Sequence, residues 1–293
     1  MSNKGLIGVQ MSTIAPNKMP SFDAYESMAK LAEIGYRCIE ISQVPMTKEN
    51  VAGFRRAIDE LGFTVCATSC AVDAGNPGSE SLSNPDQFKK LVEDCKTLNC
   101  DMMRIGMMPI MNMLDLDKAI EFTKRADEYA CMLKEHGIDL YYHNHHFEFT
   151  KMNGKYLLDI IKENTKYLGF ELDTHWIHRG GEDPVKFINQ YAGRIRLLHL
   201  KDYRIGRFKL PEGGITPGDR QSMMKLFGQM NTLVEFAEVG EGSLDMPACI
   251  EAGLAGGSKY FLVEQDNTYD RTPFEALKIS HDNLVKMGYG EWF

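Results

Sequence analysis

Ionisable side chains recur two residues apart at the ends of apolar runs in this 293-residue chain. The pairs are Glu171 with Asp173, His199 with Lys201, Glu264 with Asp266, and His143 with His145. Because side chains alternate along a strand, the members of each pair share one face. Buried carboxylates repel one another unless a cation neutralises them, and mixed oxygen and imidazole ligands suit Mn, Zn, Co or Fe better than Mg. The pattern predicts a site for one divalent metal ion.

Strand-like and helix-like segments alternate along the chain with a period of about 30 residues, as in successive βαβ units. The expected strands are 6–11, 38–42, 64–68, 102–106, 138–143, 168–173, 195–200 and 260–264. The expected helices are 22–34 (N-cap Ser21), 48–61, one that starts at Pro85, 115–135, 247–256 and 273–286. Eight such units predict an α/β fold, a (β/α)8 TIM barrel, in which the strand ends that carry the ionisable pairs meet at one face.

A long excursion, residues 203–244, separates the seventh expected strand from its helix, and 233–239 within it resembles an additional strand. An insertion of this length in a compact domain is usually functional. The sequence shows no linker, low-complexity tract or break in composition. We therefore expect a single domain over residues 1–293.

Composition excludes several classes of protein. The hydrophobic content of 43% and charged content of 25% are typical of a folded globular chain. The formal net charge of -8 argues against a nucleic-acid partner. No run approaches the ~20 apolar residues of a membrane span, and the first residues have no signal-peptide core. Seven Cys without CxxC spacing indicate reduced thiols, so we expect a cytoplasmic protein without a membrane partner.

Five motifs give the chain a family resemblance. They are HNHHFEF at 143–149, LDTHW at 172–176, HLKD at 199–202, EVGEG at 238–242 and VEQD at 263–266. In this order and spacing, over nearly the whole chain, they resemble the sugar phosphate isomerase/epimerase family of xylose isomerase-like TIM barrels. That group also includes ketose 3-epimerases, inosose dehydratases, enzymes that cleave 3-keto-glycosides, and endonuclease IV-like proteins. The resemblance implies the same barrel and a metal-dependent sugar chemistry.

The resemblance also implies metal ligands, since the family holds one ion with Glu, Asp, His and Glu from successive strands. Asp173, His199 and Glu264 match this pattern directly. The first Glu has no match, because the fifth strand ends in His-Asn-His. We expect Glu148 to take its place, which would keep a charge of -3 around the ion, with His143 as the alternative ligand. The expected ion is Mn, with Co, Zn, Fe or Mg as alternatives.

Candidate catalytic groups lie beside these ligands. An imidazole with an ordinary pKa near 6.5 is a suitable base at neutral pH, so His145 is the candidate for proton removal next to a sugar carbonyl. Lys201 could donate a hydrogen bond to that carbonyl, or could instead form a salt bridge to a nearby carboxylate. Glu40, His143 and Trp176 are the candidates for substrate binding, although Trp176 could equally be a core residue.

The reactions of the family share removal of a proton next to a carbonyl and differ in the step after it. We favour reprotonation, as in an isomerase or epimerase; the alternative is β-elimination, as in a lyase of the 3-keto-glycoside deglycosidase or inosose dehydratase type. The sequence lacks a clear phosphate-binding loop, so we expect an unphosphorylated sugar. An endonuclease does not fit the acidic charge. We expect a homo-oligomer, or a hetero-oligomer with a second subunit. The Met-rich segment 107–113 is either an apolar wall, a subunit contact or ordinary core.

Overall fold

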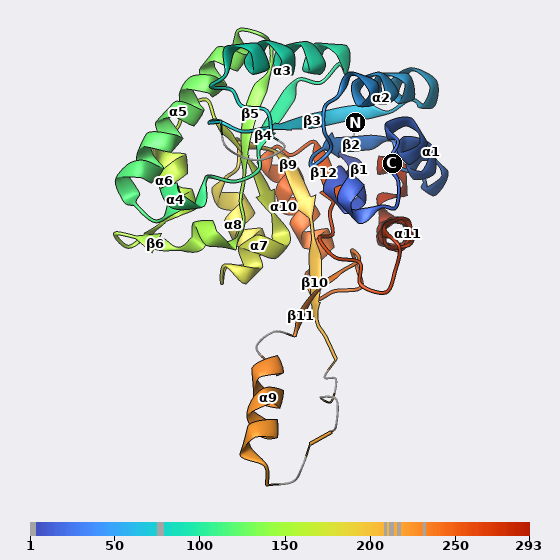
Figure 1. Ribbon diagram of the computed structural model, residues 1–293, viewed down its shortest axis with the longest axis vertical. Helices are drawn as coiled ribbons and strands as arrows, with labels where there is room; N and C mark the ends of the chain where they lie inside the picture. Colours follow the sequence, from blue (N-terminus) through green and yellow to red (C-terminus); the bar gives the residue numbers. More distant parts are fainter. Residues whose placement is uncertain (1–3, 75–78, 208–209, 211–213, 216–217, 231–232) are drawn as a thin grey trace.

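A closed barrel of parallel strands forms the centre of the computed structural model, which describes residues 4–74, 79–207, 210, 214–215, 218–230 and 233–293 (Figure 1). The barrel strands are β1 (Leu6–Gln10), β2 (Cys38–Ile41), β3 (Thr64–Cys70), β4 (Met102–Ile105), β5 (Asp139–His143), β8 (Gly169–Asp173), β9 (Ile195–Leu200) and β12 (Tyr260–Val263). They follow one another around the barrel in chain order, and β12 closes it against β1. The predicted (β/α)8 TIM barrel is confirmed.

Helices connect the strands and cover the outside of the barrel (Figure 1). They are α1 (Ala24–Ile34), α2 (Lys48–Leu61), α3 (Pro85–Thr97), α4 (Ile110–Met113), α5 (Leu116–Lys134), α6 (Leu157–Glu163), α7 (Thr174–Arg179), α8 (Pro184–Gln190), α10 (Met246–Gly256) and α11 (Pro273–Leu284). The 3-10 turn η3 (His146–Phe149) and the hairpin of β6 (Lys151–Met152) and β7 (Lys155–Tyr156) lie between β5 and α6. None of the described helices is long and apolar enough to span a membrane.

Local sequence explains where these helices begin. Asn84 caps α3 ahead of Pro85, as the sequence indicates, and Asp115 accepts a hydrogen bond from the Lys118 N–H at the start of α5. The predicted start of the first helix at residue 22 is wrong, because the side chain of Asp23, not Ser21, accepts from the Glu26 N–H. A carboxylate at that position also stabilises the helix through its interaction with the positive end of the helix dipole.

The barrel interior changes from apolar to charged along its axis. Alternation places residues two apart on the same face, so each inward apolar residue is followed by an inward polar one. The apolar cluster contains Cys38, Cys66, Met102, Tyr141, Leu197 and Leu262. The residues two positions further along five of these six strands are Glu40, Arg104, His143, His199 and Glu264, all buried. The second, larger apolar cluster packs between strands and helices. Apolar packing therefore fixes the strands that carry the charged layer.

A projecting arm, residues 202–237, interrupts the β9–α10 connection (Figure 1). It contains β10 (Asp202–Ile205), α9 (Arg220–Met230) and β11 (Val234–Ala237), and β10 pairs with β11 in antiparallel register. The additional strand expected at 233–239 therefore belongs to this hairpin and not to the barrel. The Asp202 carboxylate accepts hydrogen bonds from the N–H groups of Gly240, Gly242 and Leu244, which fixes the base of the arm.

We expect Gly8→Ala to destabilise the barrel. A Cβ at Gly8 would lie 2.6 Å from the carbonyl oxygen of Cys38 on β2, and backbone at this position cannot move aside without disturbing the strand pairing. Overpacking of this kind costs about 1–3 kcal/mol, which scanning calorimetry would show as a lower melting temperature. Gly228→Ala on α9 is the matched control, because a Cβ there meets nothing within 4 Å. Equal melting temperatures for the two variants would contradict this close approach of β1 to β2.

Candidate active site

The carboxyl ends of β5, β8, β9 and β12 bring four buried ligand-type side chains together. One atom from each of His143, Asp173, His199 and Glu264 lies within 4.8 Å of the atoms from the other three. His143 and His199 have ring centroids 4.5 Å apart, and Asp173 Oδ2 lies 3.7 Å from His199 Nδ1. Consecutive barrel strands supply these residues, which is why sequence positions up to 121 apart converge here.

Two further carboxylates occupy the other side of His199. Its Nε2 lies 3.0 Å from Glu40 and 3.2 Å from Glu171, whereas its Nδ1 lies 3.0 Å from Glu264. Burial alone would lower the pKa of His199, but the charges of Glu171, Glu40 and Glu264 raise it well above its ordinary value. In the absence of a metal ion, His199 is therefore an imidazolium that both groups of carboxylates stabilise.

Arg104 neutralises part of this acidic group. Its Nε donates to Glu40 at 2.7 Å and lies 3.5 Å from Glu171, and its guanidinium also donates to Ser42 Oγ at 2.6 Å. Burial opposes ionisation of Glu40, but Arg104 and His199 together lower its pKa to about 2. Burial and the neighbouring Glu40 charge raise the pKa of Glu171 to about 8. One of these two carboxyls thus carries a proton at neutral pH.

Lys201 lies on the opposite side of Glu264. Its Nζ lies 3.0 Å from Glu264, 2.8 Å from Asp266 and 3.9 Å from Asp173. Burial alone would lower the pKa of Lys201, but these three carboxylates raise it above its usual range. Burial alone would raise the pKa of the Glu264 carboxyl, but the charges of Lys201 and His199 hold it well below its ordinary value. Glu264 is therefore an ionised carboxylate, and Gln10 and Ser12 donate to its second oxygen at 3.0 and 2.9 Å.

The four-residue cluster fits a divalent metal ion. Within the described part of the chain, Arg104 and Lys201 are the permanent cations that face five carboxylates, at 2.7–3.9 Å. His143 Nδ1 and Asp173 Oδ2 are buried and have no hydrogen-bond partner. Buried polar atoms rarely lack a partner, so these two atoms indicate a missing ligand. Burial and His199 lower the pKa of His143 well below its ordinary value, which leaves its ring neutral and free to bind a metal.

The donor set also restricts which ion fits. Two imidazoles and two carboxylates suit Mn, Fe, Co or Zn, whereas Mg prefers oxygen ligands alone. The Nε2 atom of His199 faces Glu40 and Glu171, and a carboxylate behind a ligating imidazole fixes the ring and its tautomer. His143, Asp173, His199 and Glu264 therefore form a candidate ligand set, and Glu40 and Glu171 support His199 from its other side.

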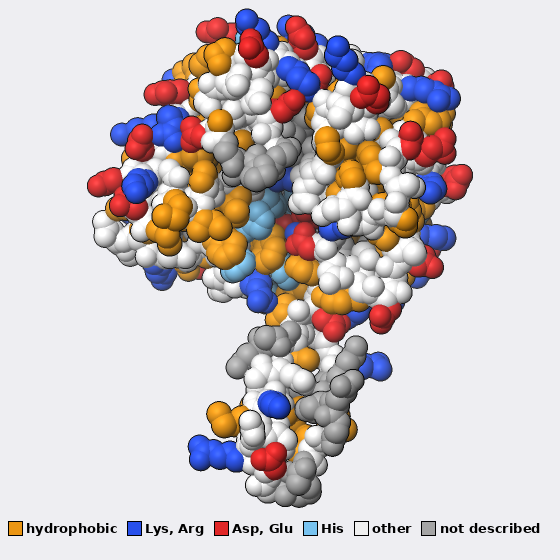
Figure 2. All heavy atoms as spheres, viewed as in Figure 1, with side chains coloured by type: hydrophobic (Ala, Val, Ile, Leu, Met, Phe, Trp, Pro, Cys, Tyr) orange, Lys and Arg blue, Asp and Glu red, His pale blue; other side chains and the backbone are white. Residues whose placement is uncertain are grey.

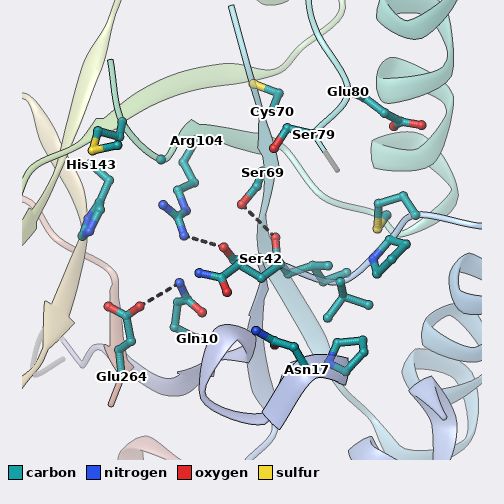
Figure 3. Close-up of a pocket in the computed structure, with 18 of the residues that line it drawn as sticks. Gln10, Asn17, Ser42, Ser69, Cys70, Ser79, Glu80, Arg104, His143 and Glu264 are labelled. Carbon is teal, nitrogen blue, oxygen red and sulfur yellow. Dashed lines mark hydrogen bonds between the residues drawn. The ribbon is translucent and has the colours of Figure 1, made fainter. Parts of the chain in front are cut away.

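A cavity of about 1030 Å³ opens above this cluster. Its polar wall includes Gln10, Ser42, Arg104, His143 and Glu264 (Figure 3). His145 and Asp266 also line it. In the space-filling view, His side chains are visible in the hollow of the barrel face, above the root of the arm (Figure 2). The volume and the polar lining suit a small hydroxylated molecule.

The structure does not bring Glu148 into the cluster of His143, Asp173, His199 and Glu264. Glu148 lies in η3, where one carboxylate oxygen accepts from the Tyr142 hydroxyl at 2.7 Å and the other from the His145 N–H at 2.8 Å. His143, the alternative ligand, is the fourth member of the cluster, so its role as a ligand stays a prediction that this placement favours. The reason is local: the chain turns into a 3-10 helix after β5, and Glu148 caps that turn.

His145 lines the cavity as expected, but its predicted pKa is wrong. Burial and the nearby Lys201 charge lower the pKa of His145 to about 3, so the ring is neutral throughout the physiological range. Its ring centroid lies 4.8 Å from that of His143 and 5.4 Å from that of Trp176. A neutral imidazole at this point can accept a proton, although the free base is weaker than the sequence suggests.

Three other predicted residues lie below the cavity surface. Glu40 is fully buried against Arg104 and His199, Lys201 is bound by carboxylates, and neither lines the cavity. Lys201 Nζ also lies 4.9 Å above the Trp176 ring, and Trp176 stacks on His146 with centroids 5.0 Å apart. Trp176 thus supports Lys201 and the His-rich turn. Direct contact of Glu40, Lys201 or Trp176 with a substrate stays a prediction.

Arg104 and Glu171 are the site residues to which the sequence assigns no role. Arg104 is detectable as the single charged residue in β4, a strand otherwise composed of Met and Ile. A lone cation in an apolar strand is rarely buried unless an acid pairs with it. The spacing places Glu171 on the face of Asp173, but its partner Arg104 cannot be identified without the barrel.

We expect His143→Ala to lose the metal and Glu148→Gln to retain it. Removing one of four ligands should weaken Mn or Zn binding by more than the roughly 10–100-fold that loss of a supporting residue costs. Each variant is dialysed against a limiting metal concentration, and inductively coupled plasma mass spectrometry measures the amount of metal ion bound per protein. The two variants are matched, since both change buried residues of the same β5–η3 segment. Metal loss in Glu148→Gln with retention in His143→Ala would reverse the assignment.

We expect Glu148→Gln to change how stability depends on pH. Burial raises the pKa of Glu148 from 4.5 to about 7, so the folded protein binds this proton more tightly than the unfolded chain. The contribution of that proton to the free energy of unfolding is complete below pH 4.5 and is lost as the pH rises through about 7. The melting temperature of Glu148→Gln, relative to that of the native protein, should therefore rise between pH 5 and pH 8. A difference in melting temperature between the two proteins that stays constant from pH 5 to pH 8 would contradict the raised pKa of Glu148.

Comparisons with known proteins agree with this geometry. The sequence model of the xylose isomerase-like TIM barrel family matches residues 28–282. A curated relative, the inosose dehydratase of Geobacillus thermodenitrificans, is 29% identical over 175 residues, which is 58% of this chain and 54% of that protein. The match thus spans about half the length of this relative.

Solved structures share the fold over nearly the whole chain. A sugar phosphate isomerase/epimerase from Parabacteroides distasonis has a TM-score of 0.69 at 19% identity and covers 99% of this chain and 96% of its own. The E. coli 3-keto-D-glucoside 4-epimerase gives 0.65 at 14% identity, with 97% and 100% coverage. The IolI protein with a bound zinc atom gives 0.63 at 16% identity, with 98% and 99% coverage. With the barrel, its strand-end site and the matching family model, the chain belongs to the xylose isomerase-like TIM barrel family.

Proposed function

We propose that this protein is a metal-dependent enzyme that removes a proton next to the carbonyl of an unphosphorylated keto-sugar, as an isomerase or epimerase does. The observation that carries the proposal is the cluster of His143, Asp173, His199 and Glu264, two of which (His143 and Glu264) line a cavity whose wall also includes His145. A divalent ion held by these four residues would supply positive charge for the oxyanion that forms when such a proton leaves. The solved IolI structure, whose fold this chain shares, contains a bound zinc atom, which supports a metal ion in a barrel of this fold.

The chain's own residues divide the remaining work. His145 is neutral at physiological pH and accepts the proton, and the charge that it gains faces Glu264 on the same wall. Lys201 stays charged and holds Glu264 and Asp266 in place at 3.0 and 2.8 Å. Arg104 fixes Glu40, which fixes His199 in turn. The lysine and the arginine therefore position the ligands rather than react.

The cavity wall supports a substrate without phosphate. Among the described residues that line the cavity, Arg104 is the one with a Lys or Arg side chain. Its guanidinium already donates to Glu40 and Ser42. The acids Glu80, Glu264 and Asp266 line the same wall. Apart from the proposed ion, a phosphate group would find one cationic side chain there that is already paired, whereas hydroxyl groups would find both donors and acceptors.

Elimination is the second candidate, and one specific observation favours it. The curated relative at 29% identity is an inosose dehydratase, a lyase by name. Both reactions would begin with the same proton removal, and they differ in whether a substituent leaves afterwards. The structural neighbours named as epimerases support the first candidate. The two candidates therefore share the site but predict different products.

We expect the Mn-loaded protein in D2O to exchange the α-proton of a responsive keto-sugar, and His145→Gln to slow that exchange by roughly 10²–10⁴-fold. Proton NMR of a panel of unphosphorylated keto-sugars records the exchange and the product together. An exchanged or epimerised sugar identifies the isomerase class, and release of a substituent identifies the lyase class. His146→Gln is the matched control, because His146 is the next imidazole along the chain and does not line the cavity.

Two outcomes would contradict the proposal. Unchanged exchange after the metal is removed with a chelator would exclude the metal-dependent mechanism. Unchanged exchange in His145→Gln, with the fold intact by circular dichroism, would exclude His145 as the base.

A further inference from the structure

The helix α9 carries an apolar face that stays exposed among the described residues of the chain. Met223, Met224, Phe227 and Met230 lie at spacings of one, three and four residues, which places them along one side of the helix. Their side chains are exposed, Met224 at 63% and Phe227 at 56%. α9 contains no buried residue, because the β10–β11 hairpin holds it away from the barrel (Figure 1).

A second exposed apolar patch lies on the barrel rim beside the cavity. It consists of Ile110, Met111, Leu114 and Phe147, and we refer to it as the apolar rim. α4 follows β4 and η3 follows β5, and these two strands are neighbours in the barrel. Tyr142 joins the two loops, because its hydroxyl accepts from the Met108 N–H and donates to Glu148. The apolar rim is therefore held at the mouth of the site.

Charge distinguishes the arm from the barrel. The arm, residues 202–237, contains five Lys and Arg against four Asp and Glu, a net charge of +1 in a chain whose formal net charge is -8. The rest of the chain therefore carries -9. On α9 the cationic residues are Arg220 and Lys225, whereas the exposed Asp115 and Asp117 follow the apolar rim directly. The arm and the rim thus complement each other in charge and both present apolar surface.

We propose that two copies of this chain form a dimer in which α9 of each copy packs on the apolar rim of the other. The arm leaves the barrel at the carboxyl end of β9, the same face that carries the rim, yet it projects away from its own barrel. A two-fold axis would let each arm reach the partner's rim and would close the assembly, since the same two patches meet twice. Within the Met-rich segment 107–113, Met107 lines the cavity and Met108 and Met113 are buried, and the exposed Ile110 and Met111 then serve as a subunit contact.

The occupant is a second copy rather than another protein because both halves of the contact are present in one sequence. Exposed apolar surface of this kind marks an interaction site in a folded protein. Two copies of the chain attract each other electrostatically when the positively charged α9 of one copy meets the negatively charged barrel of the other. This requirement fixes the relative orientation of the two copies. The dimer requires neither the metal nor the reaction, so it stands independently of the proposed function.

The first experiment measures the mass of the full chain by light scattering and sedimentation. We expect a dimer at micromolar concentration, and we expect Met224→Glu with Phe227→Glu to raise its dissociation constant by at least roughly 30-fold, as for residues at the centre of an interface. The matched control is Gln221→Glu with Gln229→Glu, which adds the same two charges to the side of α9 opposite the apolar face. A monomeric native protein, an unchanged dissociation constant in the first variant, or equal effects of the two variants would overturn the proposal.

The second experiment maps the contact. A photoreactive benzoylphenylalanine in place of Phe227 is activated in a mixture of ¹⁵N-labelled and unlabelled chains, and mass spectrometry identifies the linked peptides. We expect cross-links between labelled and unlabelled chains that end within residues 107–117 or 146–149. Cross-links confined to one chain, or links to any other surface of the partner, would overturn the proposal even if the protein is a dimer.

Discussion

The contact of His199 with two groups of carboxylates is the interaction on which the site depends. Its Nδ1 faces Asp173 and Glu264, and its Nε2 faces Glu40 and Glu171. Buried carboxylates at such distances destabilise one another unless positive charge lies between them. A proton on His199 supplies that charge when no ion is present, and a metal ion can take its place at Nδ1. The same ring thus connects the ligands of the cluster to the Arg104 group behind them.

The barrel makes this concentration of charge tolerable. Apolar side chains such as Met102, Leu197 and Leu262 fill one end of its interior, and close packing there holds the strands in register. The charged layer needs fixed geometry, because an unpaired buried charge costs far more than a paired one. Arg104 and Lys201 meet this need from two sides, since each donates to carboxylates that are themselves anchored at strand ends.

Much of the fold could be predicted because its signals are local. The alternation of strand and helix patterns locates all eight barrel strands to within one or two residues. The strand-end pairs predict that Asp173, His199 and Glu264 converge, and the structure brings these three residues together. The departures depend on the three-dimensional contacts. Charge arithmetic favours Glu148 as a ligand, whereas the 3-10 turn after β5 directs it to Tyr142 and the His145 N–H. The pKa of His145 depends on burial and on Lys201, which no spacing in the sequence reveals.

Lys201 is the one residue between β9 and β10, so the barrel strand that carries His199 continues directly into the arm. No loop separates the two, and Asp202 clamps the junction through three backbone N–H groups. The backbone of the β10–β11 hairpin is therefore continuous with the backbone that carries Lys201 and His199. A displacement of β10 is therefore transmitted directly to Lys201 and, through β9, to His199.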